Sequence, residues 1–440
     1  MAGKKKSPSL VFLRNETDIF SESGYDVSVQ STDYTHYYPT SSIGDSSIPI
    51  SFFIQGDDLH YIDLSQTALF IRGRVLDNAN NAVPVYNKET RVAPVNNFLH
   101  SLFEQCVVHL NETQITSSTN LYMYRALIET ILAFSGDSTD TIGATSFYFK
   151  EHTNLYDPAN EEPWKARQAL IQGGNEFDLI GRPHLDICAQ TRYLIPGVDI
   201  RFTFHRTRPE FYMMQQKTDL KYRFDITQAR LIVKRHTLLP SILANHLKLW
   251  DNGFAATYPM RRAELKSYTL ATGTTQNVNE NILNGHLPDR IIIALVLTSY
   301  IHGEYNKNSA FFEPFDIGQL SVTCNGNQIY HQTYNLNFKK LQYTEPYYNL
   351  FSALGTDMWS DGPHITLQDF KTGRTMFCFN LRDYKDGFCV PRYGNVRIEM
   401  KFNTALEKSV TVLVHADYQS VLQIDNNKNV SFKDFSNTSE

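Results

Sequence analysis

One pattern occurs twice in this chain of 440 residues, as Val108-His-Leu-Asn-Glu-Thr-Gln-Ile115 and as Val322-Thr-Cys-Asn-Gly-Asn-Gln-Ile329. Asn, Gln and Ile stand at the same spacing in both copies. Each copy is followed by an amphipathic segment that opens with tyrosines, which are Tyr122 and Tyr124 in one half and Tyr347 and Tyr348 in the other. Similarity at a fixed place in two halves is typical of a repeated structural unit.

The similarity continues in the same order along both halves. Each half has a strand pattern introduced by glycine, Gly197-Val-Asp-Ile-Arg-Phe202 and Gly394-Asn-Val-Arg-Ile-Glu-Met400. Each half then closes with an alternating strand, Ala229-Arg-Leu-Ile-Val233 and Val410-Thr-Val-Leu-Val414. Four matches in one order indicate two copies of one β-rich module joined in tandem.

Short alternating runs predict most of the regular structure. Leu69, Ile71, Gly73 and Val75 occupy every second position, the period of a half-buried strand, and 198–204 and 396–402 alternate in the same way. Residues 291–297 are continuously apolar. That run predicts a strand covered on both faces, by a second sheet on one side and a neighbouring subunit on the other.

Three short helices are predicted. Apolar residues recur at helical spacing over 124–132, where Arg125 and Glu129 pair on the polar side. The same spacing over 347–354 has Thr344 as N-cap, Pro346 in the first turn and Gly355 just past the end. A third helix, 239–250, lies mid-chain where a connector between modules is expected, with these residues turned inward: Leu239, Ile242, Leu243, Leu247 and Trp250.

Composition favours an all-β protein with large contact surfaces. The chain contains 25 Tyr and 28 Phe, side chains that suit pleated surfaces and interfaces. Two eight-stranded jelly-roll sandwiches, a double jelly roll with a few short helices in its loops, would protect the strand edges. Three such chains around a three-fold axis present six similar sandwiches, so a trimer approximates a hexagon that tiles a shell.

Charge and cysteines exclude several classes of protein. A net charge of −5 argues against binding nucleic acid over the whole surface. Cys106, Cys188, Cys324, Cys378 and Cys389 form no CxxC pair, so free thiols are expected rather than a disulfide framework or zinc site. No apolar segment follows the N-terminal lysines, and no run is long enough to span a membrane, so folding inside the cell is expected.

These patterns divide the chain into five parts. Residues 1–47 are rich in Ser, Thr, Asp and Tyr without a sustained period and are expected to be an N-terminal arm. The remaining parts are predicted as follows: first jelly roll 48–238, connecting helix 239–250, second jelly roll 251–425 and C-terminal tail 426–440.

Segments spread over nearly the whole chain, about 48–432, resemble the double jelly-roll major capsid (hexon-like) proteins of Polinton/Maverick elements and adintoviruses. That lineage also includes adenovirus hexon and virophage capsid proteins. The segments that carry the resemblance are Asp58-Leu-His-Tyr-Ile-Asp-Leu-Ser65, Pro94-Val-Asn-Asn-Phe-Leu-His-Ser-Leu-Phe103, Tyr124-Arg-Ala-Leu-Ile-Glu-Thr-Ile-Leu132, Tyr258-Pro-Met-Arg-Arg262, Leu287-Pro-Asp-Arg-Ile-Ile-Ile293, Tyr393-Gly-Asn-Val-Arg-Ile-Glu-Met-Lys-Phe402 and Val421-Leu-Gln-Ile-Asp-Asn-Asn-Lys-Asn-Val430.

The resemblance implies a structural protein of the virion. It implies pseudo-hexagonal homotrimeric capsomers that tile an icosahedral shell around double-stranded DNA, with penton and minor capsid proteins as neighbours. The protein would be made in the host cytoplasm, with assembly in the cytoplasm or the nucleus. Lys4, Lys5 and Lys6 suggest an inner-face contact with packaged DNA or a neighbouring capsomer, set against a merely solvated tail.

Enzyme motifs are absent from the sequence. It contains no HExxH, GxSxG or P-loop, so neither catalytic residues nor a cofactor is predicted. The densest acidic cluster, Asp57 and Asp58 with His60 and Asp63, is more often a solvated turn than a cation site. Ile171-Gln-Gly-Gly174 resembles an adenovirus-type protease cleavage site, although a glycine loop is the simpler explanation.

Three other interpretations remain open at this point. A host genome can recruit such a gene to make particles with a different cargo. A jelly-roll carbohydrate-binding protein would use exposed aromatics, but secretion is then expected and no signal is present. A cupin-type enzyme requires clustered histidines and a carboxylate on adjacent strands, and that spacing is absent.

Overall fold

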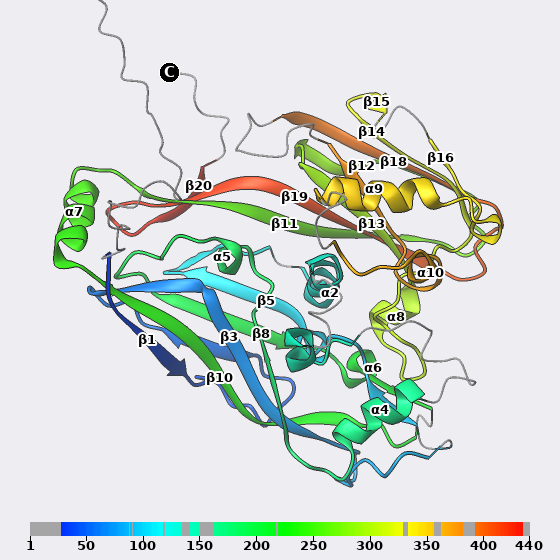
Figure 1. Cartoon of the computed structure of the whole chain (residues 1–440), viewed down its shortest axis with the longest axis horizontal. Coiled ribbons are helices and arrows are strands. Elements are labelled where there is room, and N and C mark those ends of the chain that lie inside the picture. Colours follow the sequence, from blue (N-terminus) through cyan, green and yellow to red (C-terminus); the bar gives the residue numbers. More distant parts are fainter. Residues whose placement is uncertain are drawn as a thin grey trace, which may run out of the picture.

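The computed structural model describes residues 28–87, 89, 91–117, 119–133, 141–149, 162–216, 219–328, 333–355, 362–381 and 392–433. Two β-sandwiches are stacked on one another and joined at one end by a helix (Figure 1). All of the paired strands are antiparallel. The fold is the predicted double jelly roll.

The first module has two four-stranded sheets. One sheet has the order β1 (Val29–Tyr37), β10 (Arg223–Leu238), β3 (His60–Leu76) and β7 (Phe177–Gly181). The facing sheet has the order β2 (Ile50–Ile54), β8 (Ile200–Arg206), β5 (Phe103–Leu110) and β6 (Thr113–Gln114). A separate ribbon pairs β4 (Val92–Pro94) with β9 (Met213–Gln215).

The second module repeats this arrangement strand for strand. Its first sheet has the order β11 (Ala256–Leu270), β19 (Val410–Ile424), β13 (Arg290–Leu297) and β17 (Met376–Asn380), with β20 (Val430–Lys433) added on β19. Its second sheet has the order β12 (Gln276–His286), β18 (Tyr393–Phe402), β14 (Ile317–Cys324) and β15 (Asn327–Gln328), with β16 (Tyr334–Asn335) added on β14. Equivalent strands occupy equivalent places in both chain order and sheet order, which confirms the tandem repeat.

The repeated sequence pattern forms the same hairpin in both modules. Asn111 and Asn325 adopt the left-handed conformation, at φ 52° and 50°, in the turns that leave β5 and β14. The Asn111 side-chain oxygen accepts a hydrogen bond from the backbone N–H of Asp199 at 3.0 Å. The Asn325 oxygen accepts from the N–H of Asn395, also at 3.0 Å. The conserved spacing therefore reflects one turn that fastens two strands in each module.

The predicted helices are present, with two corrections. They are α2 (Tyr122–Ala133), α7 (Pro240–Asp251) and α9 (Thr344–Leu354), and Gly355 ends α9 with φ 78°. The N-cap of α9 is Tyr343, so the predicted cap Thr344 is the first helical residue instead. In α7 Trp250 is buried and Ile242 and Leu243 pack partly buried against the first module's core, so the predicted inward stripe is wrong only at Leu247, which is 42% exposed.

The remaining helices are short and lie in the loops. They are α1 (Phe98–Ser101), α4 (Glu162–Ile171), α5 (Asp186–Ala189), α6 (Pro209–Tyr212), α8 (Thr298–His302) and α10 (Leu367–Thr372), with 3-10 turns at Ile142–Ser146 and Phe338–Lys340. No helix in the described parts of the chain combines the length and apolarity needed to cross a bilayer.

The cover of β13 differs from the prediction. Ile291 and Ile293 face the core of their own sandwich, while Ile292 and Ala294 lie opposite His415 and Leu413 on the other face of the sheet. The expected cover for that face was a neighbouring subunit. It is instead α2 of the first module, whose apolar residues share one buried cluster with β13 and β19.

Strands also form inside the two segments predicted as termini. β1 lies within the predicted arm 1–47 and pairs with β10 along its length, so for 29–37 the arm prediction is wrong. Its residues show little apolar alternation because both faces of this edge strand are exposed over residues 30–34. β20 lies within the predicted tail 426–440 and pairs with β19. β1 and β20 form because they pair with strands β10 and β19, and a local sequence pattern does not show such pairing.

Candidate assembly surfaces

The contact between the two modules is built around a charged residue pair on α2. Arg125 and Glu129, predicted as a pair, are joined by a hydrogen bond of 2.8 Å between Nε and Oε1. They do not lie on a solvent-exposed face, because the second module covers them. Arg125 also donates to Asp186 of α5 at 2.6 Å, and Asp186 accepts from the backbone N–H of Ala263 in β11 at 3.0 Å.

Histidines extend this network into the second module. Glu129 accepts from His184 Nδ1 at 2.7 Å and lies 3.7 Å from His415 Nε2 in β19. His415 in turn lies 3.5 Å from Asp417, which accepts from Arg290 at 2.8 Å. Burial alone would raise the pKa of Glu129, but Arg125 and the histidines hold it well below its usual range. The modules are thus joined by a network of charged side chains that are buried or partly buried.

The equivalent sheet of the first module presents its outer face differently. Phe70 of β3 lies directly opposite Arg230 of β10, whose guanidinium sits 4.1 Å from the centre of the phenyl ring. Arg72 approaches the same ring at 5.7 Å. Ile232 beside them is partly exposed, and Tyr34 of β1 is 61% exposed. This amphiphilic surface is the counterpart of the face that α2 covers in the second module.

Helix α9 is the counterpart of α2 and also has an exposed side. Tyr348 is 71% exposed, and Glu345 and Ser352 are exposed on the same helix. Its other side is packed, since the Tyr347 hydroxyl donates to the carbonyl of Ile365 at 2.9 Å. Tyr347 therefore packs within its own module, whereas Tyr348 is exposed to solvent.

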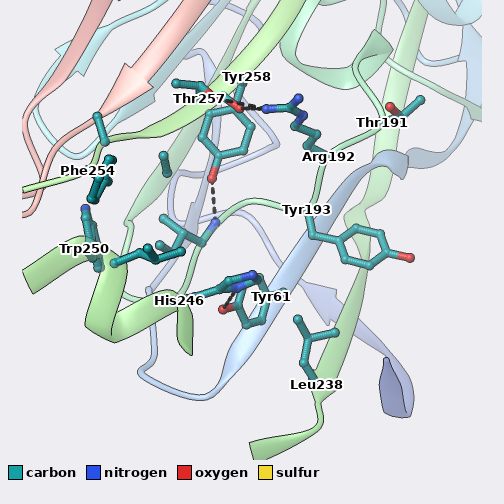
Figure 2. Close-up of a pocket in the computed structure, with 14 residues that line it drawn as sticks. Tyr61, Thr191, Arg192, Tyr193, Leu238, His246, Trp250, Phe254, Thr257 and Tyr258 are labelled. Atoms are coloured by element: carbon teal, nitrogen blue, oxygen red, sulfur yellow. Dashed lines mark hydrogen bonds between the residues drawn. The ribbon is translucent and has the colours of Figure 1, made fainter. Parts of the chain in front are cut away.

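A pocket of about 570 Å³ lies where α7 meets the start of β11. Figure 2 shows its aromatic lining, with Tyr61 directed at His246 and Tyr258 directed at the loop that precedes β8. The Tyr61 hydroxyl is 2.8 Å from His246 Nδ1, and the backbone N–H of Ile195 donates to the Tyr258 hydroxyl at 3.0 Å. Its volume lies within the range of small-molecule pockets, and aromatic and aliphatic side chains form much of its lining.

The other predicted site residues are resolved as follows. Lys4, Lys5 and Lys6 lie outside the described residues. Asp57 accepts from His60 at 2.9 Å and from Arg235 at 2.7 Å, so its charge is already neutralised by protein groups. Across the residues that the structure describes, no cluster of His, Cys, Asp and Glu is arranged to hold a metal ion. The acidic cluster is therefore a structural turn.

Two further sequence features are structural in this molecule. Ile171, at the start of the protease-like stretch, is fully buried, and Gly173 and Gly174 form a turn with φ 76° and 67° in which Gly173 donates to the carbonyl of Val83. A protease needs an extended, accessible segment, and this turn does not offer one. Cys106, Cys188, Cys324 and Cys378 are free thiols, and burial raises the pKa of Cys188 and Cys378 to about 12.

Sequence patterns missed most of the network between the modules. Arg125 and Glu129 are spaced for a helical pair, but His184, Asp186 and His415 belong to separate segments with no shared spacing. Only packing of the two modules brings them together.

The architecture defines the chain as a double jelly-roll protein, the fold of viral major capsid proteins. Among solved structures, it is similar to a chain of the Sputnik virophage (TM-score 0.58, 13% identity, 98% of this chain and 94% of that chain). It is also similar to the PBCV-1 virus capsid (TM-score 0.58, 10%, 94% and 100%) and to the mavirus major capsid protein (TM-score 0.52, 12%, 98% and 97%).

The sequence comparisons are sparser. No family model matches the sequence. An uncharacterized protein of Caenorhabditis elegans is 21% identical over 392 residues, which cover 86% of this chain and 91% of that protein. The matched residues cover most of this chain and therefore reach into both modules.

Proposed function

We propose that this chain is a major capsid protein of the Polinton/Maverick and adintovirus kind, with no enzymatic role. Three copies would form a pseudo-hexagonal capsomer, and capsomers would tile an icosahedral shell around double-stranded DNA. The similarity in fold to capsid proteins over nearly the full chain supports this class of function.

The observation that carries the trimer is the contact inside one chain. Helix α2 of the first module covers the outer face of the β11-β19-β13-β17 sheet of the second. On the equivalent face of β1-β10-β3-β7, Arg230 and Ile232 are partly exposed and Phe70 is buried next to the Arg230 guanidinium. The equivalent helix α9 exposes Tyr348. If α9 of one chain covers this sheet on the next, the same contact repeats head to tail and closes after six modules, which is three chains.

The chemistry of the two surfaces suits that contact. The sheet face combines apolar Ile232 with the guanidinium groups of Arg72 and Arg230, and the helix offers Glu345 beside Tyr348. Aromatic and arginine side chains are enriched in the centres of protein interfaces. An acidic group on the helix would pair with the basic face, as Glu129 pairs with Arg125 in the internal contact.

The same proposal places the remaining parts of the chain. We propose that residues 239–250 connect the modules, that the first module begins at Val29 rather than at residue 48, and that the second module extends through β20. Lys4, Lys5 and Lys6 would touch packaged DNA or a neighbouring capsomer from the inner face. Penton and minor capsid proteins would be partners in the virion, with assembly in the cytoplasm or nucleus after synthesis in the cytoplasm.

One observation favours a second candidate function. The relative in Caenorhabditis elegans shows that a sequence similar to this one, over both modules, occurs in an animal. A host could retain such a gene to make particles that carry a cargo other than viral DNA. Both candidates predict the same capsomer and differ only in what the particle encloses.

The test is the mass of the purified native protein in solution by light scattering, with negative-stain images of the same sample. A stable trimer of hexagonal outline, or closed particles, supports the capsomer. A monomer that persists at high concentration overturns it. Sequencing of the nucleic acid that the particles protect from nuclease then distinguishes the two candidates. Protected DNA that encodes this protein supports a viral shell, and a different cargo supports the host-recruited particle.

A further inference from the structure

The pocket beside α7 lies where three parts of the chain meet. Tyr61 of β3 belongs to the first module, Trp250 to α7 and Tyr258 of β11 to the second module (Figure 2). Hydrogen bonds fix these walls, since in addition to the Tyr61 and Tyr258 contacts Arg192 donates to the carbonyl of Thr257 at 2.6 Å. A pocket whose walls are already ordered loses little conformational entropy when a ligand fills it.

Ring side chains form a large part of the pocket lining. Tyr61, Trp250 and Tyr258 are buried in its walls. Phe254 and Leu249 also line the pocket, but they are 64% and 43% exposed and so keep apolar surface open to solvent. Aromatic side chains attract other rings by stacking or edge-to-face contact. The lining therefore favours a planar, apolar molecule.

The charge of the pocket lining is positive. Arg192 is exposed there, and neither Asp nor Glu is among the lining residues that the structure describes. Arg192 uses Nη1 for the carbonyl and the hydroxyl of Thr257, at 2.6 and 3.0 Å. That leaves Nε and Nη2 with no hydrogen bond to any described residue, and two such guanidinium donors suit the two oxygens of a carboxylate. The pocket therefore selects a ligand with an acidic group.

We propose that this pocket binds a small aromatic carboxylate. The ring system would lie beside Trp250 and Phe254, and the carboxylate would accept hydrogen bonds from Arg192 Nε and Nη2. A molecule in this position contacts both modules and α7 at once, so its binding stabilises their arrangement. This site does not depend on the capsid proposal.

Titration calorimetry of the full chain with 2-naphthoate tests the site. We expect saturable binding of one molecule per chain. The matched ligand is 2-naphthamide, which has the same rings without the negative charge, and its dissociation constant should be at least tenfold higher. Absence of saturable 2-naphthoate binding, or equal affinities for the two ligands, would overturn the proposal.

Two variants locate the bound molecule. Arg192→Gln should weaken 2-naphthoate binding at least tenfold and leave 2-naphthamide binding unchanged. Phe254→Ala removes an exposed ring, so the chain stays folded, and it should weaken the binding of both ligands several-fold. The control is Arg201→Gln, because Arg201 is also exposed but lies over the Phe53 ring and outside the pocket lining. If neither pocket variant changed the affinity, the ligand would bind elsewhere and the proposal would be wrong.

Hydrogen exchange of the full chain gives a second, independent measurement. Saturating 2-naphthoate should slow exchange several-fold over residues 242–258, because the ligand contacts α7 and the start of β11. Exchange over β13, 291–297, which lies in the core of the second module, should stay unchanged. Unchanged exchange over 242–258 in the presence of bound ligand would contradict the assignment to this pocket.

Discussion

Two asparagines, one in each module, stabilise the same turn of the fold. Asn111 and Asn325 each have a left-handed backbone conformation, and each side chain accepts a hydrogen bond from the backbone near the start of the neighbouring strand. That strand is β8 for Asn111 and β18 for Asn325. Asparagine tolerates this conformation better than other residues with a Cβ atom, because its short polar side chain bonds locally.

Asn325→Ala should therefore lower the free energy of unfolding by about 2 kcal/mol, from backbone strain of about 1 kcal/mol and a lost hydrogen bond of about 1 kcal/mol. Chemical denaturation measures the difference. Asn325→Gly is the control, since it relieves the strain and should recover about half of the loss. An alanine variant as stable as the natural chain would contradict the assigned role of the turn.

His100 makes stability depend on pH. It is buried, its Nδ1 lies 3.1 Å from the Tyr122 hydroxyl, and its ring centre lies 4.7 Å from that of His184. Burial, helped by the charge of His184, lowers the pKa of His100 well below its usual value, although Glu129 opposes the shift. The unfolded chain then binds a proton near pH ~6.5 that the folded chain does not.

The contribution of His100 to stability should accordingly be constant above about pH 7 and fall as the pH drops below about 6.5. His100→Gln should flatten this slope in urea unfolding series between pH 7.5 and 5.5. Part of the slope should remain, because burial also lowers the pKa of His236. The exposed His36→Gln is the control and should leave the slope unchanged. A slope equally steep in His100→Gln would refute the assignment.

At the scale of elements, α2 has two tasks. It follows β5 in the first module, and it covers a sheet of the second with apolar residues and the Arg125–Glu129 pair. Because the side chains of Arg125 and Glu129 are mostly shielded from water, their charges are stabilised mainly by partner side chains rather than by solvent.

Glu129→Gln should cost about 3 kcal/mol of unfolding free energy, the lower end for breaking a buried ion pair, because Arg125 keeps Asp186 as a partner. Denaturation followed by both tryptophan fluorescence and circular dichroism measures it. The control is Asp178→Asn, which breaks the exposed pair with Arg72 and should cost less than about 1 kcal/mol. Equal costs for the two variants would show that burial of the network does not matter.

At the scale of the whole molecule, the contact between the modules of one chain and the proposed contact between chains have the same form. In each, a helix of one module covers the outer face of a sheet of another. The outer sheet face of the first module would be buried in a trimer and exposed in a monomer. A charge placed there costs little in the monomer and much in the assembly.

Ile232→Glu should raise the dissociation constant of the trimer at least about tenfold while the chain stays folded, because a carboxylate would be buried at the centre of the contact. Light scattering over a dilution series measures this, with circular dichroism for the fold. The control Val278→Glu makes the same change at an exposed position of β12 and should leave the trimer intact. An unaffected Ile232→Glu trimer would place the interface elsewhere.

Much of the fold follows from local sequence patterns. Alternation at Leu69, Ile71 and Val75 predicts β3, and the Asn-containing repeat predicts two copies of one module. Helical spacing locates α2 and α9, and Gly355 marks the end of α9. These features are determined by the sequence alone because each rests on residues within one element, where periodicity reflects which face is buried.

Tertiary structure alone decided the rest. β1 carries no strong alternation and exists as a strand because β10 offers it a paired edge. Leu247 fits a helical stripe yet is exposed, because no described element covers that side of α7. His415 meets Glu129 only because the modules pack together. Pairing and burial between distant segments depend on where the chain places them, and that information is absent from any local pattern.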